Sequence, residues 1–242
     1  MSMVLNYQLS VFGSFKITPK PETITELMPK MNLHPDIMLL PNVVTGQQIE
    51  IPTNNITITS NLNFVSTKQQ YVVSITDERI DVNYNRVNDE EINIEQFYSF
   101  AISILTVLLD FTGTKATRLA VNIQYVYNFS SFPLMHDFGK KVIKEVPYYS
   151  DKELSEWSIR LNSESEIKIG EYDEMVNVIT DVNSAQDITG KKPAVLFHID
   201  INTSPKNSTS RFDSVSLKSF VDNALERASE IYTGVEGLLR DE

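Results

Sequence analysis

The stretch Ile94–Thr112 constrains the possible folds of this chain more than any other segment. Eleven of the fifteen residues 97–111 are apolar. The four polar exceptions are spaced by four, three and four positions: Ser99, Ser103, Thr106 and Asp110. In an α-helix these spacings place the polar side chains on one narrow stripe, while every other side of the helix is apolar. We therefore expect a core helix with a sheet packed around it.

A membrane span is the alternative interpretation of so apolar a helix. The uncharged run 96–109 contains fourteen residues, whereas crossing a bilayer takes about 20 residues. The sequence therefore favours a buried helix, and we expect no insertion into a membrane.

Composition excludes several classes of function. The chain has 242 residues, of which 41% are hydrophobic, enough to bury a large core in one domain or two. Its net charge of −11 repels phosphate backbones, so we expect no direct binding of nucleic acid. The absence of cysteine excludes disulfides, thiolate catalysis and thiolate metal sites. The first residues lack the pattern of a secretory signal, which favours a cytoplasmic location.

The first half of the chain has strand periodicity on both sides of one short helical segment. Apolar and polar residues alternate over residues 4–17, as in a half-buried strand. Pro21 suits the first turn of a helix that we expect Pro29 to break or end. Residues 35–52, which contain three prolines and a glycine, are expected to be irregular. Three alternating runs then predict an antiparallel meander before the core helix: 56–65, 70–76 and 79–86.

The second half repeats this order. Residues 117–128 alternate, Pro133 opens a short helix to about residue 146, and an amphipathic helix occupies residues 214–239. Four strands are predicted between the two helices: 155–162, 166–171, 174–182 and 194–201. The sequence thus predicts an α+β fold. Its antiparallel sheet would come from two similar strand, helix, meander, helix halves, residues 1–113 and 114–242, as two domains or one continuous domain packed on the long helices.

One local match accompanies the repeated order. The tripeptide Asn6-Tyr7-Gln8 corresponds to Asn122-Ile123-Gln124 at an offset of 116 residues. Duplication of a unit and convergence of two amphipathic strands both explain this match. The last helix also has two interpretations, because its single apolar face suits either the protein's own sheet or the surface of a partner or second copy.

Two segments of the second half support a resemblance to a known family. They are Arg118-Leu119-Ala120-Val121-Asn122-Ile123 and His198-Ile199-Asp200-Ile201, followed by the closing amphipathic helix. In these features the chain resembles a sporadically distributed, functionally uncharacterised family of bacterial proteins of about 250 residues, which have an Arg-Leu-Gly-Leu-Arg-Tyr-like strand and an Asp-Ile-Asp-Val-like strand. The chain departs from that pattern at Asn122 and His198. The resemblance implies a cytoplasmic accessory protein of a prokaryotic defence or toxin–antitoxin type of locus.

The repeated plan is also similar in topology to the SecB-type export chaperones, as if two such units were fused. This analogy of topology implies a protein that binds extended, apolar polypeptide segments.

Candidate catalytic residues are few. His198 and Asp200 lie two positions apart on a predicted strand, so their side chains share one face of the sheet. Arg118 would lie near them if the first and last strands of the half are neighbours. A hydrogen-bonded structural role and a catalytic role are both open for this set. The chain lacks the usual nucleophile, phosphate-loop and histidine-pair motifs, and we expect no cofactor and no metal.

Two classes of function follow from these observations. The first is a non-enzymatic protein-interaction module that binds a protein partner or forms a homodimer, with a SecB-like peptide-binding chaperone as a variant. The second is a hydrolase or transferase that uses His198, Asp200 and Arg118. The acidic residues of segment 164–174 are expected to form a solvated strand edge.

Overall fold

The computed structural model describes residues 2–50, 55–87, 92–142, 152, 154, 156–186 and 192–240. The first half contains β1 (Ser2–Phe12), α1 (Pro21–Met31), β2 (Leu39–Glu50), β3 (Asn55–Ser66), β4 (Tyr71–Ile75), β5 (Arg79–Asn85) and α2 (Ile94–Thr112). The second half contains β6 (Arg118–Asn128), α3 (Phe132–Val142), β7 (Ser158–Ile169), β8 (Tyr172–Gln186), β9 (Pro193–Thr203) and α4 (Ser214–Arg240).

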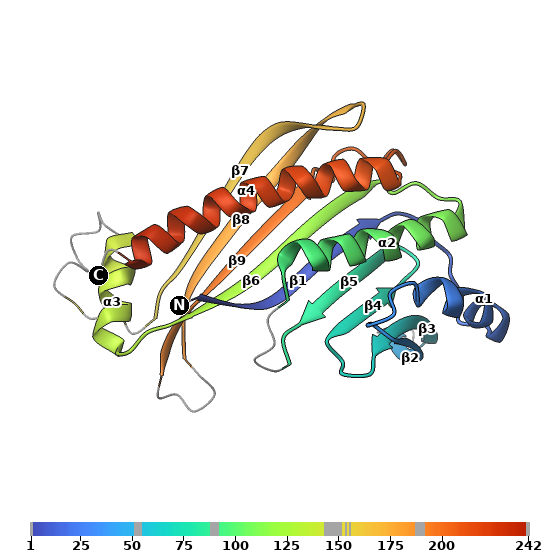
Figure 1. Cartoon of the computed structure of the whole chain (residues 1–242), viewed down its shortest axis with the longest axis horizontal. Coiled ribbons are helices and arrows are strands. Elements are labelled where there is room, and N and C mark those ends of the chain that lie inside the picture. Colours follow the sequence, from blue (N-terminus) through green and yellow to red (C-terminus); the bar gives the residue numbers. More distant parts are fainter. Residues whose placement is uncertain are drawn as a thin grey trace.

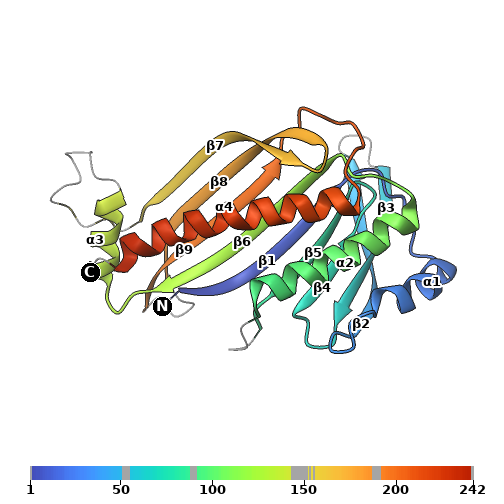
Figure 2. The same ribbon diagram turned by 45° about the horizontal axis from the view of Figure 1, so that its top comes forward.

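In the described part of the chain, all nine strands belong to one antiparallel sheet, so the predicted α+β fold is confirmed. The strand order is β2-β3-β4-β5-β1-β6-β9-β8-β7. The long helices α2 and α4 lie on the same face of this sheet, and α1 lies on that face beside α2 (Figures 1 and 2). The two halves therefore share one sheet and one layer of helices.

The two halves meet at the pair formed by β1 and β6, and its register is symmetric. Tyr7 pairs with Ile123, its own counterpart at the offset of 116 residues, while Asn6 pairs with Gln124 and Gln8 pairs with Asn122. Asn6 thus pairs with the counterpart of Gln8, and Gln8 pairs with the counterpart of Asn6. This is the pattern of a symmetric contact between two copies of one unit. This register supports duplication as the origin of the repeat.

Helix α2 forms where the sequence predicts it, because both ends are capped. The side chain of Asn93 accepts a hydrogen bond from the backbone N–H of Glu95 at 2.7 Å. Gly113 has a φ of 61° and its N–H bonds to the carbonyls at the end of the helix, a conformation that glycine adopts without steric cost. By length and composition alone α2 could also cross a membrane. In the structure, α2 lies on one face of the sheet with eight side chains buried, while Ile102, Val107 and Phe111 are only partly buried. The expectation of a sheet packed around this helix is therefore wrong, because the sheet covers one side of it.

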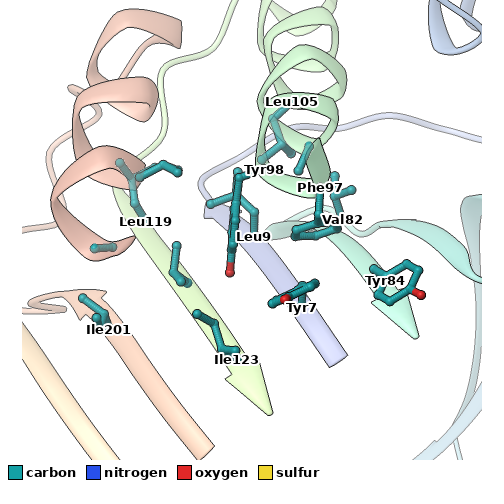
Figure 3. Packing of buried hydrophobic residues seen from close by; sticks show 14 of the residues in the cluster. Tyr7, Leu9, Val82, Tyr84, Phe97, Tyr98, Leu105, Leu119, Ile123 and Ile201 are labelled. Atoms are coloured by element: carbon teal, nitrogen blue, oxygen red, sulfur yellow. The ribbon is translucent and has the colours of Figure 1, made fainter. Parts of the chain in front are cut away.

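The core lies between α2 and the central strands. Figure 3 shows Phe97, Tyr98 and Leu105 of α2 facing Tyr7 and Leu9 of β1. The rings of Phe97 and Tyr7 stack with their centroids 5.4 Å apart, and Leu105 and Leu9 are fully buried. Tyr98 reaches the junction between the halves, and burial raises the pKa of its hydroxyl. This hydroxyl donates to the carbonyls of paired residues on β1 and β6.

Four local predictions are wrong. The strand expected over residues 4–17 ends at Phe12. Residues 35–52 were expected to be irregular, yet they contain β2, which pairs with β3 along its whole length. Pro41 and Gly46 are tolerated in β2 because it is an edge strand among the described strands. An edge strand pairs on one side only, so it can do without the N–H of a proline. Pro29 lies inside α1 and does not end it. The separate strands predicted at 155–162 and 166–171 are the single strand β7.

The predicted end of the helix opened by Pro133 lies outside the described residues, since the structure describes α3 to residue 142. The core helix, the first meander and the closing helix lie where the sequence predicts them.

Replacing Gly139 of α3 by alanine should destabilise the protein. Glycine to alanine inside a helix normally stabilises by about 0.5–1 kcal/mol. At Gly139, however, a Cβ would lie 2.5 Å from Nε1 of Trp157, and such overpacking costs about 1–3 kcal/mol. Trp157 is the single tryptophan of the chain, so its fluorescence during chemical denaturation reports the change. Gly234→Ala in α4 is the control, because nothing lies within 4 Å of that position. Stabilisation by both substitutions would contradict the packing described.

Candidate functional site

The face of the sheet opposite the helices carries a band of polar side chains. Directly paired residues share a face, so the strand registers arrange these side chains in rows across the sheet. One row consists of Asn83, Gln8, Asn122 and Asp200. A second consists of Asn85, Asn6, Gln124, His198 and Asp181. All three sequence-predicted candidates, His198, Asp200 and Arg118, lie on this polar face.

His198 and Asp200 share the polar face but are held by different partners. Nε2 of His198 lies 3.0 Å from Oδ1 of Asn122, and its Nδ1 lies 3.7 Å from Oδ2 of Asp181. Asp200 accepts a hydrogen bond of 3.0 Å from the side-chain amide of Asn202. His198 is therefore anchored by the neighbouring strands β6 and β8, whereas Asp200 is bonded to Asn202 of its own strand, β9.

Arg118 lies close to this pair, because β6 and β9 are neighbours. Its Nη2 donates to Oδ1 of Asn202 at 2.9 Å, and its Nε donates to the carbonyl of Thr203 at 3.1 Å. Its guanidinium also lies 4.7 Å from the centroid of the Phe12 ring. Partial burial lowers the pKa of Arg118, while the nearby charge of Asp200 acts in the opposite direction. Asn202 therefore links Arg118 to Asp200.

The polar face carries hydrogen-bonding side chains, and its carboxylates lie near cationic side chains. Asp181 also accepts from Arg160 at 2.7 Å, so the carboxylate beside His198 already has a cationic partner. No group of three or more metal-ligating side chains is arranged around a cation position among the described residues. The contacts of the polar face are those of a hydrogen-bonded sheet surface.

A large apolar cleft lies on the other face, between α4 and the outer strands β7 and β8. This feature, called here the α4–β7 cleft, has a volume of about 760 Å³. Its apolar lining includes Ile159, Leu161 and Val178 from the strands and Ile231, Val235 and Leu238 from the helix. Leu161 is 63% exposed and Leu238 is 46% exposed. Large apolar side chains at the mouth of a cleft indicate a binding surface.

Charged residues lie along the helix side of the α4–β7 cleft. Glu226, Arg227 and Glu230 of α4 line it together with the apolar side chains. On β7, Glu164 and Glu166 are exposed and point to the opposite face of the sheet from Leu161. Arg160 and Lys168 share that face of β7 with the two glutamates, so acidic and basic groups are mixed along this margin.

A second cleft of about 730 Å³ lies in the first half, between the N-terminal part of α2 and strands β4 and β5. It is more polar, with His34, Lys68, Glu95 and Gln96 in its lining. Tyr71 lines it as well, and burial, followed by the neighbouring Tyr84, raises the pKa of Tyr71 to about 12. At neutral pH this hydroxyl is therefore a neutral hydrogen-bonding group.

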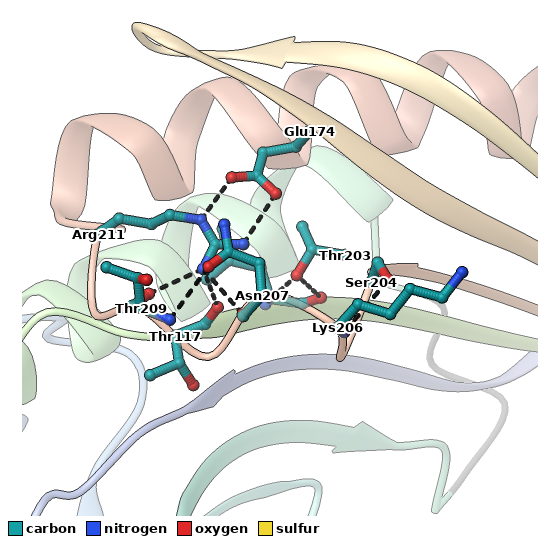
Figure 4. A network of polar contacts seen from close by, with 9 residues as sticks. Thr117, Glu174, Thr203, Ser204, Lys206, Asn207, Thr209 and Arg211 are labelled. Carbon is teal, nitrogen blue, oxygen red and sulfur yellow. Dashed lines mark hydrogen bonds and ion pairs between the residues drawn. The ribbon is translucent and has the colours of Figure 1, made fainter.

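Helix α4 is positioned by a buried ion pair. Glu174 and Arg211 are 5% and 4% exposed, and Nη2 of Arg211 donates to Oε2 of Glu174 at 2.8 Å. Nη1 of Arg211 donates to the carbonyls of Thr117, Asn207 and Thr209 (Figure 4). The pair thus ties the connection that precedes α4 to the sheet. Glu174 corrects the expectation that segment 164–174 is solvated throughout.

The first turn of α4 is capped by Asp213. Its Oδ1 accepts from the backbone N–H of Ser216 at 3.0 Å. This hydrogen bond lowers the pKa of Asp213. With the ion pair, the cap fixes where α4 begins and hence its course over the second half.

The residues of the α4–β7 cleft were not among the sequence-predicted candidates. The closing helix gave one indication of these residues. It is apolar on one side, and that side suited either the protein's own sheet or the surface of a partner. Leu161 and Ser163 gave no such signal, because Leu161 lies at the end of the predicted strand 155–162 and Ser163 lies in the polar stretch between it and the next predicted strand. None of His198, Asp200 and Arg118 lines either large cleft.

Comparisons with protein-family models, with curated proteins and with solved structures find no match for this chain. The resemblance to the bacterial family and the analogy with SecB-type chaperones therefore stay predictions.

Proposed function

We propose that this protein is a non-enzymatic protein-interaction module that binds an apolar polypeptide segment in the α4–β7 cleft. The observation that carries the proposal is the cleft itself, where apolar side chains of α4, β7 and β8 surround about 760 Å³. Leu161 at its mouth is 63% exposed, and burying such a side chain against a partner contributes about 1.5–3 kcal/mol.

Charge supports a polypeptide in preference to a nucleic acid as the ligand. The net charge is −11, and two of the three charged residues lining the cleft are carboxylates, Glu226 and Glu230. A phosphate backbone is repelled by such a surface. An apolar peptide can instead bury its side chains there and leave its polar groups in water.

The polar face supports a non-enzymatic role. His198 and Arg118 bond to side chains or backbone of neighbouring strands, and Asp200 bonds to Asn202 of its own strand. Catalysis by a general base needs a base within reach of a substrate proton, usually in a cleft that holds the substrate. The two large clefts lie on other elements.

A permanently unfolded, apolar-rich polypeptide should bind the purified protein, and the affinity should change little between about 0.05 M and about 0.5 M salt because apolar burial dominates. Labelled RNA and DNA should not bind. Leu161→Asp should weaken polypeptide binding at least about tenfold, since a buried carboxylate would oppose the apolar ligand. Fluorescence anisotropy measures each affinity.

The matched control is Val44→Asp, because Val44 is an exposed apolar residue on β2, 44% accessible and far from this cleft in the sheet order. It should leave polypeptide binding unchanged. Tight, salt-sensitive nucleic-acid binding without polypeptide binding would exclude the proposed function.

A further inference from the structure

The edge strand β2 has no partner strand on its outer side among the described strands. At its start, the N–H and the carbonyl of Leu39 bond to the side-chain amide of Asn32 at 2.7 and 3.0 Å, so they point away from β3. Residues of an antiparallel strand alternate between those that bond to the neighbouring strand and those that point away. The register of β2 with β3 has no shift. Pro41, Val43 and Thr45 therefore also point outward, and Pro41 has no N–H to offer there.

The residues outside the described ranges are too few or too distant in the strand order to pair along β2. The runs 51–54, 88–91 and 187–191 hold five residues or fewer. The longer run, 143–151, lies between α3 and β7, and β7 is at the other end of the strand order. Any strand that pairs along β2 therefore comes from another molecule.

β2 also lacks the charges that usually protect the edge of a sheet. From Leu39 to Ser66, which spans β2 and β3, Glu50 is the single charged residue, although 22% of the whole chain is charged. The strand at the opposite end of the sheet, β7 (Figure 2), carries four charged side chains: Arg160, Glu164, Glu166 and Lys168. Charged side chains on an edge strand oppose pairing with other molecules. β7 is therefore guarded against an added strand, and β2 is open to one.

Exposed apolar side chains gather at the start of β2 and just before it. Among the described residues eleven large apolar side chains are exposed, and five of them lie in segment 33–44: Leu33, Met38, Leu40, Val43 and Val44. Each of the five is between 41% and 59% exposed. Leu40 and Val44 share one face of the sheet, and Val43 lies on the other. A strand added beside β2 would therefore cover apolar surface on both faces.

A second copy of β2 matches this edge. Two identical strands that run antiparallel are related by a two-fold axis, so the outward N–H groups of each meet the outward carbonyls of the other. The net charge of −11 makes two copies repel one another over most of their surfaces, whereas at β2 one uncharged strand meets another. The junction of β1 and β6 is already a contact of this kind, because it is an antiparallel pair of strands with a symmetric register.

We propose that this protein forms a two-fold dimer in which the β2 strands of two copies pair antiparallel from Val43 onward. The contact joins two nine-stranded sheets into one continuous sheet. The charged strand β7 then lies at each end, so assembly stops at two copies. The dimer surface is separate from the α4–β7 cleft, and the inference does not depend on the proposed function.

Sedimentation velocity of the full chain over a range of concentrations tests the dimer. At micromolar concentrations the particle should have twice the mass of the 27.5 kDa chain, and it should dissociate on dilution. Thr45 is exposed and lies near the middle of the open run Val43–Glu50, so charges introduced there lie near the two-fold axis. Thr45→Glu and Thr45→Lys should each weaken the dimer at least about tenfold, because like charges then face each other. An equimolar mixture of the two variants should restore the dimer, because opposite charges then face each other.

Hydrogen exchange measured at several protein concentrations shows whether β2 itself forms the contact. The amides of Val43 and Thr45 point outward, so their protection should rise as the concentration passes the dissociation constant of the dimer. The amide of Val44 points toward β3 and should be protected at every concentration.

Two variants keep this inference distinct from the proposed function. Leu161→Asp should leave the dimer intact while it weakens polypeptide binding, and Val44→Asp should weaken the dimer while it leaves polypeptide binding unchanged. A protein that stays monomeric at submillimolar concentrations would exclude a second copy as the occupant of this edge. A dimer in which the amides of Val43 and Thr45 stay unprotected, or a mixture of the two Thr45 variants that stays monomeric, would overturn pairing through β2. None of these results would alter the case for polypeptide binding at the cleft.

Discussion

Arg211→Ala is expected to lower the free energy of unfolding by about 3–5 kcal/mol, the cost of breaking a buried ion pair by removing one partner. Glu174 would be left as a buried carboxylate without its cation, and the carbonyls of Thr117, Asn207 and Thr209 would lose a shared donor. Urea denaturation followed by circular dichroism measures this loss.

A surface pair near the same helix end provides the control. Lys115 and Asp213 are 3.3 Å apart, with their side chains 52% and 45% exposed. Solvent screens such a pair, so Lys115→Ala should cost about 0–1 kcal/mol. Similar losses for Arg211→Ala and Lys115→Ala would mean that the buried pair does not fix the start of α4.

Leu105→Ala is expected to cost about 2–5 kcal/mol, the range for emptying a packed apolar site. Leu105 is fully buried in α2, and the surrounding core joins both halves of the sheet. A cavity there should therefore destabilise the whole fold in one transition. Chemical denaturation monitored by tryptophan fluorescence reports it, because Trp157 lies in the second half, away from the substitution.

Ser103→Ala on the same helix tests how the polar stripe is interpreted. From the sequence, an exposed Ser103 predicts an almost neutral substitution. In the structure Ser103 is half-buried and its Oγ lies 2.8 Å from Nε2 of His34. Loss of this hydrogen bond should cost about 1 kcal/mol. A loss as large as that of Leu105→Ala would contradict the assignment of the two faces of α2.

The placement of the catalytic candidates was partly predictable. His198 and Asp200 lie on one face because side chains two apart on a strand must do so. Arg118 lies near them because β6 and β9 are neighbours, as the repeated plan allowed. The cross-strand partners, Asn122 of His198 and Asn202 of Arg118, depend on the strand register. A slip of one residue would move every side chain of a strand to the other face of the sheet.

The α4–β7 cleft could not be predicted in the same way. It exists because α4 (Ser214–Arg240) packs beside β7 (Ser158–Ile169), a segment distant from it in the sequence, although β7 and β8 themselves form a local hairpin. Its strand wall includes Leu161 and Ser163, whose surroundings in the sequence are polar.

What the sequence determined by itself is the local periodicity of each half. The 3.6-residue period of α2 and the two-residue period of the strands arise from near neighbours, and they predicted the α+β class and the repeated order. Tertiary structure alone decided that β2 is a strand despite Pro41, because an edge strand can do without some of its amides. It also decided that Glu174 is buried with Arg211, 37 residues away in the chain. Such pairing depends on which distant segments meet, and this is set by the global packing of the chain.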